Sequence, residues 1–234
     1  MERLNKRLDV DCIVFDLDGT LIDSRKGIHR CVREVLAKRD YQSYDGEFLN
    51  SSIGVYPIDA IFQRTVREGE LEDCVREFKR MYARTLTRDV ILLDGAKETL
   101  DLLIEGGYKA ALYTLKMRNH ALKVLNHFSL KVDGILSGEE IGADKSSGKG
   151  LRGLLHVLDC RAARSVIVGD QWTDISAGKK AGMKAIGVLS GMGNFEELHR
   201  FEPDYLIGSV SDLTMILDLS MPSRNSLSND TGDA

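Results

Sequence analysis

The strongest constraint on the fold is a series of short apolar runs separated by amphipathic segments. The runs that have the composition of β-strands cover residues 12–15, 109–113, 134–136, 165–168, 185–188 and 205–207. Most of them are continuously apolar rather than alternating, which is typical of strands covered on both faces. Helical patterns between the runs cover residues 94–105, 120–128 and 150–158. This alternation predicts an α/β protein with a Rossmann-like parallel sheet as its core.

Residues 24–90 depart from this alternation, because they contain no convincing strand pattern. Apolar residues recur there at helical spacing over residues 24–39, 58–66 and 71–86. Charges of both signs are interspersed on the opposite faces, which indicates solvated surfaces rather than a binding patch. The segment therefore predicts a group of helices inserted between the first and second strands of the sheet.

These segments divide the chain into two predicted domains and a tail. A Rossmann-like catalytic core would comprise residues 1–22 and 91–219, and an inserted α-helical cap domain would comprise residues 23–90. Residues 220–234 hold few apolar side chains, so we expect a disordered tail there.

Charge and cysteine content limit the class of protein. The chain has 32 Lys and Arg against 36 Asp and Glu, and the resulting net charge of −4 disfavours a nucleic-acid-binding protein. No apolar run is long enough to span a membrane, and the first residues lack the pattern of a signal peptide. The four cysteines form no CxxC pair, which favours reduced thiols. We expect a cytoplasmic monomer or homodimer that binds neither membranes nor nucleic acids.

Acidic and hydroxyl side chains stand at the points where the apolar runs end. Asp16 and Asp18 follow the first run, and Thr114 follows the second. Asp170 and Asp174 follow the fourth run. Because ligands of open α/β sheets bind beyond the carboxyl ends of the strands, we expect these side chains to converge at one edge of the sheet.

This set of side chains has the chemistry needed to move a phosphoryl group through a carboxylate. One carboxylate can attack phosphorus, and a second one two residues away can exchange a proton with the leaving group. Further carboxylates are the hard oxygen ligands that Mg²⁺ prefers. A hydroxyl and an ammonium group, the latter from a basic loop at residues 144–150, can hold the remaining phosphate oxygens. Taken singly, Thr114 and Asp174 could instead cap helices.

Two motifs resemble those of the haloacid dehalogenase-like phosphatases. Residues 15–21 contain DxDGT, which is similar to the first motif of that family, and residues 169–174 contain GDxxxD, which is similar to the fourth. Residues 112–114 stand where the second motif is expected. The resemblance covers residues 10–215 and is greatest to the phosphoglycolate phosphatase-like and β-phosphoglucomutase-like branch. In that branch a helical cap is inserted between the first and second motifs.

The resemblance implies a role for each matching residue. Asp16 would be the nucleophile, and Asp18 would be the general acid and base. Asp16, the backbone carbonyl of Asp18 and Asp170 would bind Mg²⁺, with Asp174 supporting the ion directly or through water. Thr114 would bind the transferring phosphoryl group.

Two lysines compete for the third-motif position, which supplies the ammonium group in this family. Lys145 lies 25 residues before Asp170, which is the usual spacing in this branch. Lys149 lies only 21 residues before it, but its Lys-Gly pair resembles the form seen in other branches. We prefer Lys145 as the catalytic lysine and keep Lys149 as the alternative phosphate-binding residue. Leu115 also departs from the family pattern, which often has asparagine at this position, and the difference affects the expected substrate contacts.

These features predict a Mg²⁺-dependent phosphatase, similar to phosphoglycolate phosphatase, whose partner is a small phosphorylated metabolite. The motifs do not separate hydrolysis from β-phosphoglucomutase-like transfer to a sugar, because both reactions pass through phosphorylated Asp16. A non-catalytic binding protein on the same fold is a further alternative, since the second and third motifs depart from the family pattern. A receiver domain is disfavoured because such domains are shorter than this chain. A dehalogenase is disfavoured because its chemistry does not require Asp18.

Overall fold

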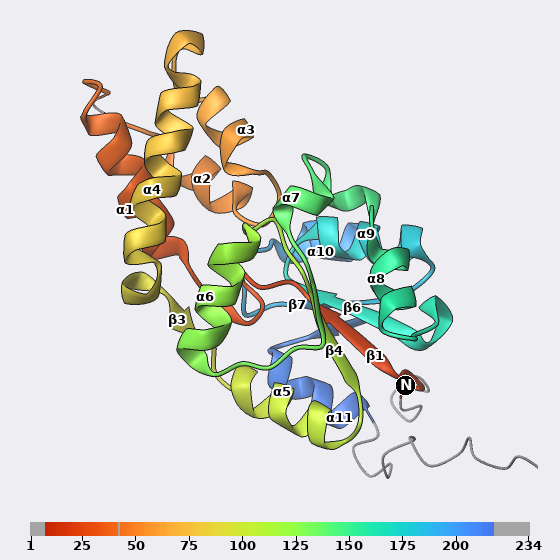
Figure 1. Cartoon of the computed structure of the whole chain (residues 1–234). Helices are drawn as coiled ribbons and strands as arrows, with labels where there is room; N and C mark the ends of the chain where they lie inside the picture. The colour runs from red at the N-terminus through yellow and green to blue at the C-terminus, as the bar shows by residue number, and fades with distance from the viewer. Residues whose placement is uncertain (1–7, 42, 218–234) are drawn as a thin grey trace, which may run out of the picture.

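The computed structural model describes residues 8–41 and 43–217 (Figure 1). Its centre is a six-stranded sheet with the order β5-β4-β1-β6-β7-β8, in which every pair of neighbours is parallel. A separate antiparallel ribbon is formed by β2 and β3. The strands are β1 (Cys12–Phe15), β2 (Ile22–Asp23), β3 (Ile91–Leu92), β4 (Lys109–Tyr113), β5 (Gly134–Leu136), β6 (Ser165–Gly169), β7 (Lys184–Val188) and β8 (Tyr205–Ile207). The tail predicted over residues 220–234 lies outside the described residues.

Helices follow most of the strands and cover the sheet on both faces (Figure 1). The α-helices are α1 (Arg25–Ala37), α2 (Gly46–Ser52), α3 (Ile58–Gln63), α4 (Leu71–Asp89), α5 (Ala96–Glu105), α6 (Arg118–Phe128), α7 (Gly138–Ile141), α8 (Leu151–Val157), α9 (Trp172–Ala181), α10 (Phe195–Arg200) and α11 (Leu213–Ile216). Short 3-10 helices are η1 (Glu68–Glu70), η2 (Lys145–Ser147), η3 (Ala162–Arg164) and η4 (Val210–Asp212). No helix in the described part of the chain combines the length and apolarity needed to cross a membrane.

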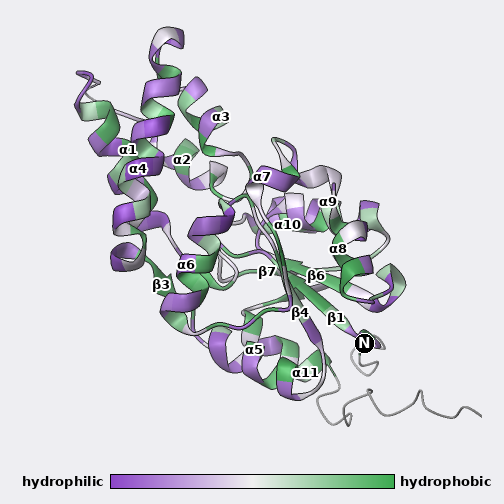
Figure 2. Cartoon of the chain, in the orientation of Figure 1, coloured by the Kyte–Doolittle hydropathy of each residue, from purple (hydrophilic) through white to green (hydrophobic). Residues whose placement is uncertain are grey.

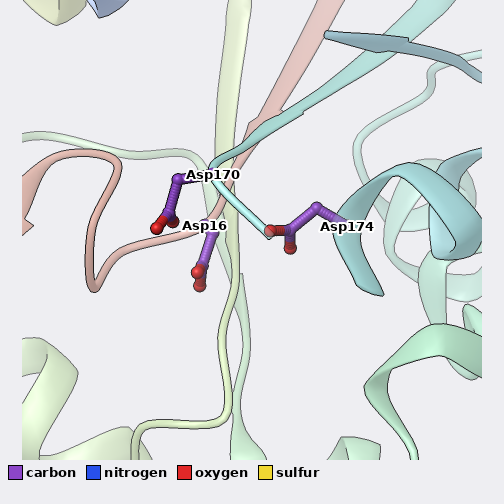
Figure 3. A group of neighbouring side chains, drawn as sticks. All are labelled: Asp16, Asp170 and Asp174. Atoms are coloured by element: carbon purple, nitrogen blue, oxygen red, sulfur yellow. The ribbon is translucent and has the colours of Figure 1, made fainter. Parts of the chain in front are cut away.

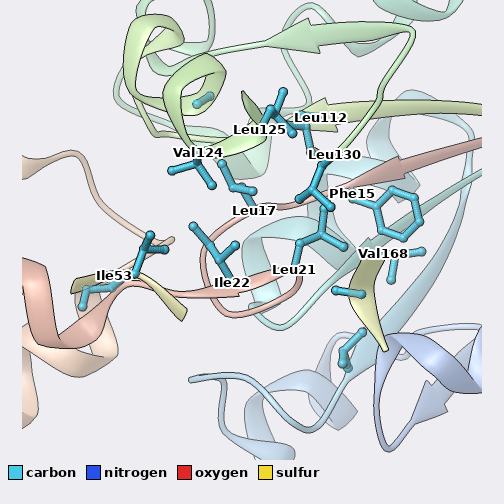
Figure 4. Close-up of a cluster of buried hydrophobic side chains, with 14 of the residues drawn as sticks. Phe15, Leu17, Leu21, Ile22, Ile53, Leu112, Val124, Leu125, Leu130 and Val168 are labelled. Carbon is cyan, nitrogen blue, oxygen red and sulfur yellow. The ribbon is translucent and has the colours of Figure 1, made fainter. Parts of the chain in front are cut away.

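The sheet is buried because successive residues of its central strand pack into different hydrophobic clusters. Cys12 and Val14 belong to the cluster beneath α8 and α9. Ile13 and Phe15 belong to a larger cluster, which continues from the sheet through the loop after β1 to Ile53 (Figure 4). Figure 2 shows the same pattern, with apolar strands inside and polar helix faces outside. Because both faces of the sheet are buried, its strands must be apolar at successive positions, as the sequence predicts.

The strand order places a ligand-binding crevice beside β1. The chain leaves β1 toward β4 and β5 on one side, and returns to β6 on the other side, so the direction of winding reverses between β1 and β6. Ligands of doubly wound sheets bind at the carboxyl ends of the strands at this reversal. Asp16 directly follows β1 and Asp170 directly follows β6, so two of the predicted acids lie at the reversal.

The helices α1 to α4, called here the helical insert, leave the core and return to it through the β2–β3 ribbon. Ile22 pairs with Leu92 and Asp23 pairs with Ile91. The longest helices of the insert, α1 and α4, pack against each other (Figure 1). Within the insert the ring of Phe78 stacks on Tyr82 at 5.3 Å between centroids. The insert thus has an apolar interior, and its buried residues belong to the same hydrophobic cluster as Ile13 and Phe15 of the sheet.

The six predicted sheet strands are all present, and their ends differ by at most one residue, at β6 and β7. The ribbon and several short helices, including α2, α7 and α10, are not predicted from the sequence. The predicted helix over residues 58–66 is wrong at its end, because α3 stops at Gln63. The backbone amides of Arg64 and Thr65 bond to carbonyls three residues back, which tightens the last turn.

Candidate active site

The predicted acids meet at the carboxyl edge of the sheet. The backbone amide of Asp16 donates to the carbonyl of Val168 at 2.9 Å, which holds the residue against the end of β6. Asp170 follows that strand, and Asp174 lies in the first turn of α9. Figure 3 shows the three carboxylates of Asp16, Asp170 and Asp174 directed toward a common region. All three residues are buried, at 1%, 0% and 0% exposure respectively.

Lys145 is the cation of this cluster. Its Nζ lies 2.8 Å from Oδ1 of Asp16 and 2.8 Å from Oδ1 of Asp174, and its side chain is fully buried. Burial alone would lower the pKa of Lys145, but the two carboxylates outweigh that effect and raise it. The structure therefore brings Lys145 to the acids. Lys149, in contrast, is exposed in the turn before α8.

The three carboxylates carry more negative charge than one lysine can offset. Burial raises the pKa of Asp16 well above its usual value, and the neighbouring Asp174 and Asp170 carboxylates add to this effect against the opposing influence of Lys145. Burial and the Asp174 carboxylate raise the pKa of Asp170 to about 7. Burial also raises the pKa of Asp174. Such a cluster favours an additional cation, since a cation would stabilise all three ionised carboxylates.

Asp170 is held in place by groups on both of its carboxylate oxygens. Thr20 donates its hydroxyl to Oδ1 at 3.1 Å, and the backbone amide of Met192 donates to Oδ2 at 2.8 Å. Gly19 lets the chain turn closely under this carboxylate. Its φ is +92°, and a β-carbon at that position would lie 2.2 Å from Oδ2 of Asp170. The glycine of the first motif is therefore required, because Asp170 of the fourth motif packs directly against it.

Asp174 combines two structural functions. Its Oδ2 accepts a hydrogen bond from the backbone amide of Gln171 at 3.1 Å, within a capping box at the start of α9. Its Oδ1 faces Lys145. The helix-capping alternative and the site alternative for Asp174 are therefore compatible. The cap orients the carboxylate toward the lysine.

Asp18 and Thr114 lie at the same edge of the sheet but have other partners. The Asp18 carboxylate is turned toward the helical insert, where Ser24 donates its hydroxyl to Oδ1 and Nζ of Lys116 lies 2.8 Å from the same oxygen. Thr114 is buried directly after β4, and its hydroxyl accepts from the backbone amide of Lys116 at 3.2 Å. The side chain of Asp18 is thus not a member of the three-carboxylate group, and the resemblance required only its backbone carbonyl there.

Lys116 is a site residue that sequence reasoning missed. Its side chain is 3% exposed, and Nζ bonds to Asp18 and to the hydroxyl of Tyr82 at 3.0 Å. Burial alone would lower the pKa of Lys116, but Asp18 and Tyr82 outweigh this and raise it. The available signal was a polar residue two positions after Thr114, in a loop at a strand end. Tyr82 comes from α4, so only the tertiary fold brings the two side chains together.

The helical insert also covers Asp16. The side-chain amide of Gln171 donates to the carbonyl of Ile53 at 3.3 Å, and Thr173 donates its hydroxyl to the carbonyl of Gly54 at 3.4 Å. A β-carbon at Gly54 would lie 3.5 Å from Oδ2 of Asp16. The segment between α2 and α3 therefore lies directly over Asp16, and the cleft beside it runs between the insert and the core.

His120 lines that cleft in its neutral form. Burial lowers its pKa to about 4, helped by the charge of Lys116, and its ring packs edge-on against Tyr82 at 5.5 Å.

The lowered pKa of His120 predicts a pH dependence of stability. As the pH falls, the His120 ring takes up a proton near pH 6.5 in the unfolded chain but only near pH 4 in the folded chain. The stability that the neutral ring contributes is therefore lost as the pH falls from about 6.5 to 4. We expect His120→Gln to remove about 2–3 kcal/mol of this pH dependence. Urea unfolding at a series of pH values checks this, with exposed His156→Gln as control. An unchanged slope in His120→Gln would contradict it.

The group formed by Asp16, Asp170 and Asp174 fits a divalent cation. Each residue offers one carboxylate oxygen, and these atoms lie within 4.8 Å of one another. Oδ2 of Asp16 is buried and has no hydrogen-bond partner in the described part of the chain, so a cation would satisfy it. An all-oxygen, incomplete set of ligands suits Mg²⁺, which usually keeps waters or phosphate oxygens in its shell.

The fold and this site define a class of protein: a doubly wound α/β protein with a carboxylate and lysine cluster at the winding reversal and a helical insert beside it. The chain belongs to the haloacid dehalogenase-like hydrolases, whose sequence model matches residues 13–188. The family resemblance seen in the two motifs is therefore confirmed.

Individual relatives match over nearly their whole length. The chain is 30% identical to a phosphoglycolate phosphatase of Aquifex aeolicus, over 88% of this chain and 96% of that one. It is 28% identical to the pyrophosphatase PpaX of Halalkalibacterium halodurans, over 90% and 98% of the two chains. The structure of a haloacid dehalogenase-like family protein from Streptococcus pneumoniae superimposes with a TM-score of 0.79 at 20% identity, covering 88% and 97%. That last similarity supports the fold.

Proposed function

We propose that the protein is a Mg²⁺-dependent phosphatase of the cytoplasm that hydrolyses a small phosphorylated metabolite through a phosphorylated Asp16. The observation that carries this proposal is the buried Asp16 carboxylate, which pairs through Oδ1 with Lys145 and has no hydrogen-bond partner at Oδ2 among the described residues. Relatives named phosphoglycolate phosphatase and pyrophosphatase support a phosphorylated substrate. A bound Mg²⁺ would offset the charge of the phosphate oxygens beside the three carboxylates.

The first half of the proposed reaction is attack by Asp16. Its carboxylate oxygen forms a bond to phosphorus as the bond from phosphorus to the leaving oxygen breaks. Lys145 lies 2.8 Å from Oδ1 of Asp16, so it fixes the orientation of this carboxylate. The Thr114 hydroxyl and the Lys145 ammonium would also bind the phosphate oxygens during transfer.

The second half is proton transfer by Asp18 and hydrolysis. Asp18 would give a proton to the leaving alcohol and then take one from the water that attacks phosphorus. Ser24 and Lys116 hold its carboxylate through Oδ1, and Oδ2 is the oxygen that would exchange the proton. We further propose that the helical insert acts as a cap, since residues 53 and 54 lie over Asp16 and exclude water from it.

The cation requirement gives a direct prediction. EDTA treatment is expected to abolish phosphate release from p-nitrophenyl phosphate, and Mg²⁺ is expected to restore it. Because the cation binds the folded cluster, saturating Mg²⁺ should also stabilise the protein by about 2–3 kcal/mol at 100 times its dissociation constant. Thermal unfolding checks the second effect without a substrate. Asp170→Asn should raise the Mg²⁺ concentration needed for both effects, whereas full activity in EDTA would refute the proposed site.

The proposed reaction is tested on a panel of phosphorylated metabolites with wild type. Release of inorganic phosphate supports hydrolysis, and transfer of the group to a sugar without release would instead support the mutase alternative. Failure to turn over any compound in Mg²⁺ would support a binding protein.

A further inference from the structure

The cleft beside Asp18 is the place that a leaving group would occupy, if the proposed function holds. It lies between the helical insert and the loop after β4, and Gly54 lines it. The same residue lies over the nucleophile, since a β-carbon at Gly54 would be 3.5 Å from Oδ2 of Asp16 and 3.8 Å from the carbonyl of Asp18. The cleft therefore begins at Asp18 and extends toward α3 and α4.

The walls of this cleft are mostly apolar. Aliphatic and aromatic side chains line it from both the insert and the core, among them Tyr56, Ile58, Phe78, Tyr82, Leu115 and Met117. Leu115 is aliphatic, so it offers this wall no group that could bind a polar substituent. Phe78 and Tyr82 are stacked, and both are buried, so they form a rigid aromatic surface.

The cations of the cleft are already matched by carboxylates. Nζ of Lys116 lies 2.8 Å from Asp18, and Nζ of Lys79 lies 3.2 Å from Asp59. Burial lowers the pKa of His120 to about 4, so its ring is not expected to carry a charge near pH 7. No arginine lines the cleft in the described part of the chain. A second anionic group on a substrate would therefore enter without an unpaired cation to meet it, and its desolvation would be costly.

The groove that adjoins the cleft adds negative charge to the approach. It shares Lys79, Leu115 and Met117 with the cleft, and it is also lined by Asp59, which pairs with Lys79, and by Glu139. A substrate with an anionic leaving group that enters along this groove would pass the Glu139 carboxylate. The negative charge along the groove and the pairing of the cations that line the cleft would therefore both disfavour an anionic leaving group.

The geometry points to a phosphate monoester whose leaving group is an uncharged alcohol or phenol with an apolar or aromatic face. This inference rests on the proposed function and names its substrate class. It separates the protein from a function on phosphoglycolate or pyrophosphate, because each of those substrates carries a second anionic group. The aromatic wall and the absence of an unpaired cation together select against that group.

A matched pair of substrates tests the inference. Phenyl phosphate and 4-carboxyphenyl phosphate differ by one carboxylate, which leaves the phenol no poorer as a leaving group. We expect wild type to have a kcat/KM at least about 10-fold higher for phenyl phosphate, and to use phosphoglycolate and pyrophosphate still less well. A preference for the carboxylated or dianionic substrates would overturn the inference, because it would show that Lys116 or Lys79 becomes free. Absence of phosphate release from every compound would overturn the proposed function, and this inference with it.

A substitution at the mouth of the cleft tests the cause of the preference. Tyr56 is 44% exposed, so Tyr56→Arg can add a cation there without disturbing the core. We expect it to reduce the preference for phenyl over 4-carboxyphenyl phosphate by at least about 5-fold, largely through KM. Leu102→Arg on α5 is the control, since Leu102 has the same exposure and lies outside the cleft. Equal ratios in both variants and wild type would contradict the electrostatic basis of the inference.

Discussion

Asp16→Asn is expected to reduce phosphate release by more than about 1,000-fold, because the amide cannot attack phosphorus and no other group replaces a lost nucleophile. The fold should persist. The substitution removes a carboxylate whose ionised form is disfavoured by burial, and Lys145 keeps its contact with Asp174 at 2.8 Å. Steady-state phosphate release in Mg²⁺ measures the loss, and circular dichroism checks the fold.

The control for this variant is Asp94→Asn, which removes a carboxylate from an exposed turn after β3. Its activity and unfolding temperature should equal those of wild type. If Asp16→Asn retained more than about a tenth of the wild-type rate, Asp16 would not be the nucleophile. Loss of activity in both variants would point to a general effect of charge rather than to covalent catalysis.

Lys145→Met is expected to lower turnover by at least about 100-fold, while Lys149→Met leaves it unchanged. Lys145 is fully buried against two carboxylates, and it is placed to orient Asp16 and to bind phosphate oxygens. Removing it also leaves Asp16 and Asp174 buried without their cation, which should destabilise the metal-free protein by about 3 kcal/mol. Urea unfolding in EDTA measures this, and steady-state kinetics measures turnover.

Lys149→Met is the matched control, because Lys149 carries the same charge, lies only four residues after Lys145 and is exposed. Its unfolding free energy should stay within about 0.5 kcal/mol of wild type. Mg²⁺ should recover part of the stability lost in Lys145→Met, because the ion compensates for the same carboxylates. Loss of turnover in Lys149→Met alone would show that the alternative lysine carries the function.

The sheet is the part of the fold that sequence reasoning predicts well. Strands such as β1 and β4 are buried on both faces, so each must be a continuous apolar run, and such runs are visible in the sequence. Short helices are harder to predict, because few of their residues are buried. Helix α2 contains Gly46 and Asn50, and it is stabilised by the Asp45 carboxylate, which accepts from the amide of Phe48 at 2.9 Å.

The candidate site divides in a similar way. Asp16 and Asp170 each follow an apolar run that is predicted to be a buried parallel strand. Their meeting at one edge of the sheet can therefore be predicted from the topology alone. The choice between Lys145 and Lys149 cannot, because it depends on how η2 packs beside α9. The contact between Lys116 and Tyr82 also depends on how the helical insert docks on the core, and no local pattern encodes that docking.

The measurement that tests the central claim most directly is the trapping of a phosphoryl group on Asp16. Wild type and Asp18→Asn, in which breakdown should be slow, are mixed with phenyl phosphate in Mg²⁺, quenched in acid within one turnover and digested for mass spectrometry. We predict one phosphoryl group on the peptide that contains Asp16, with more of it in Asp18→Asn, and none in Asp16→Asn. Unmodified Asp16 in a sample that releases phosphate at the full rate, or a phosphoryl group on another residue, would contradict the proposed mechanism.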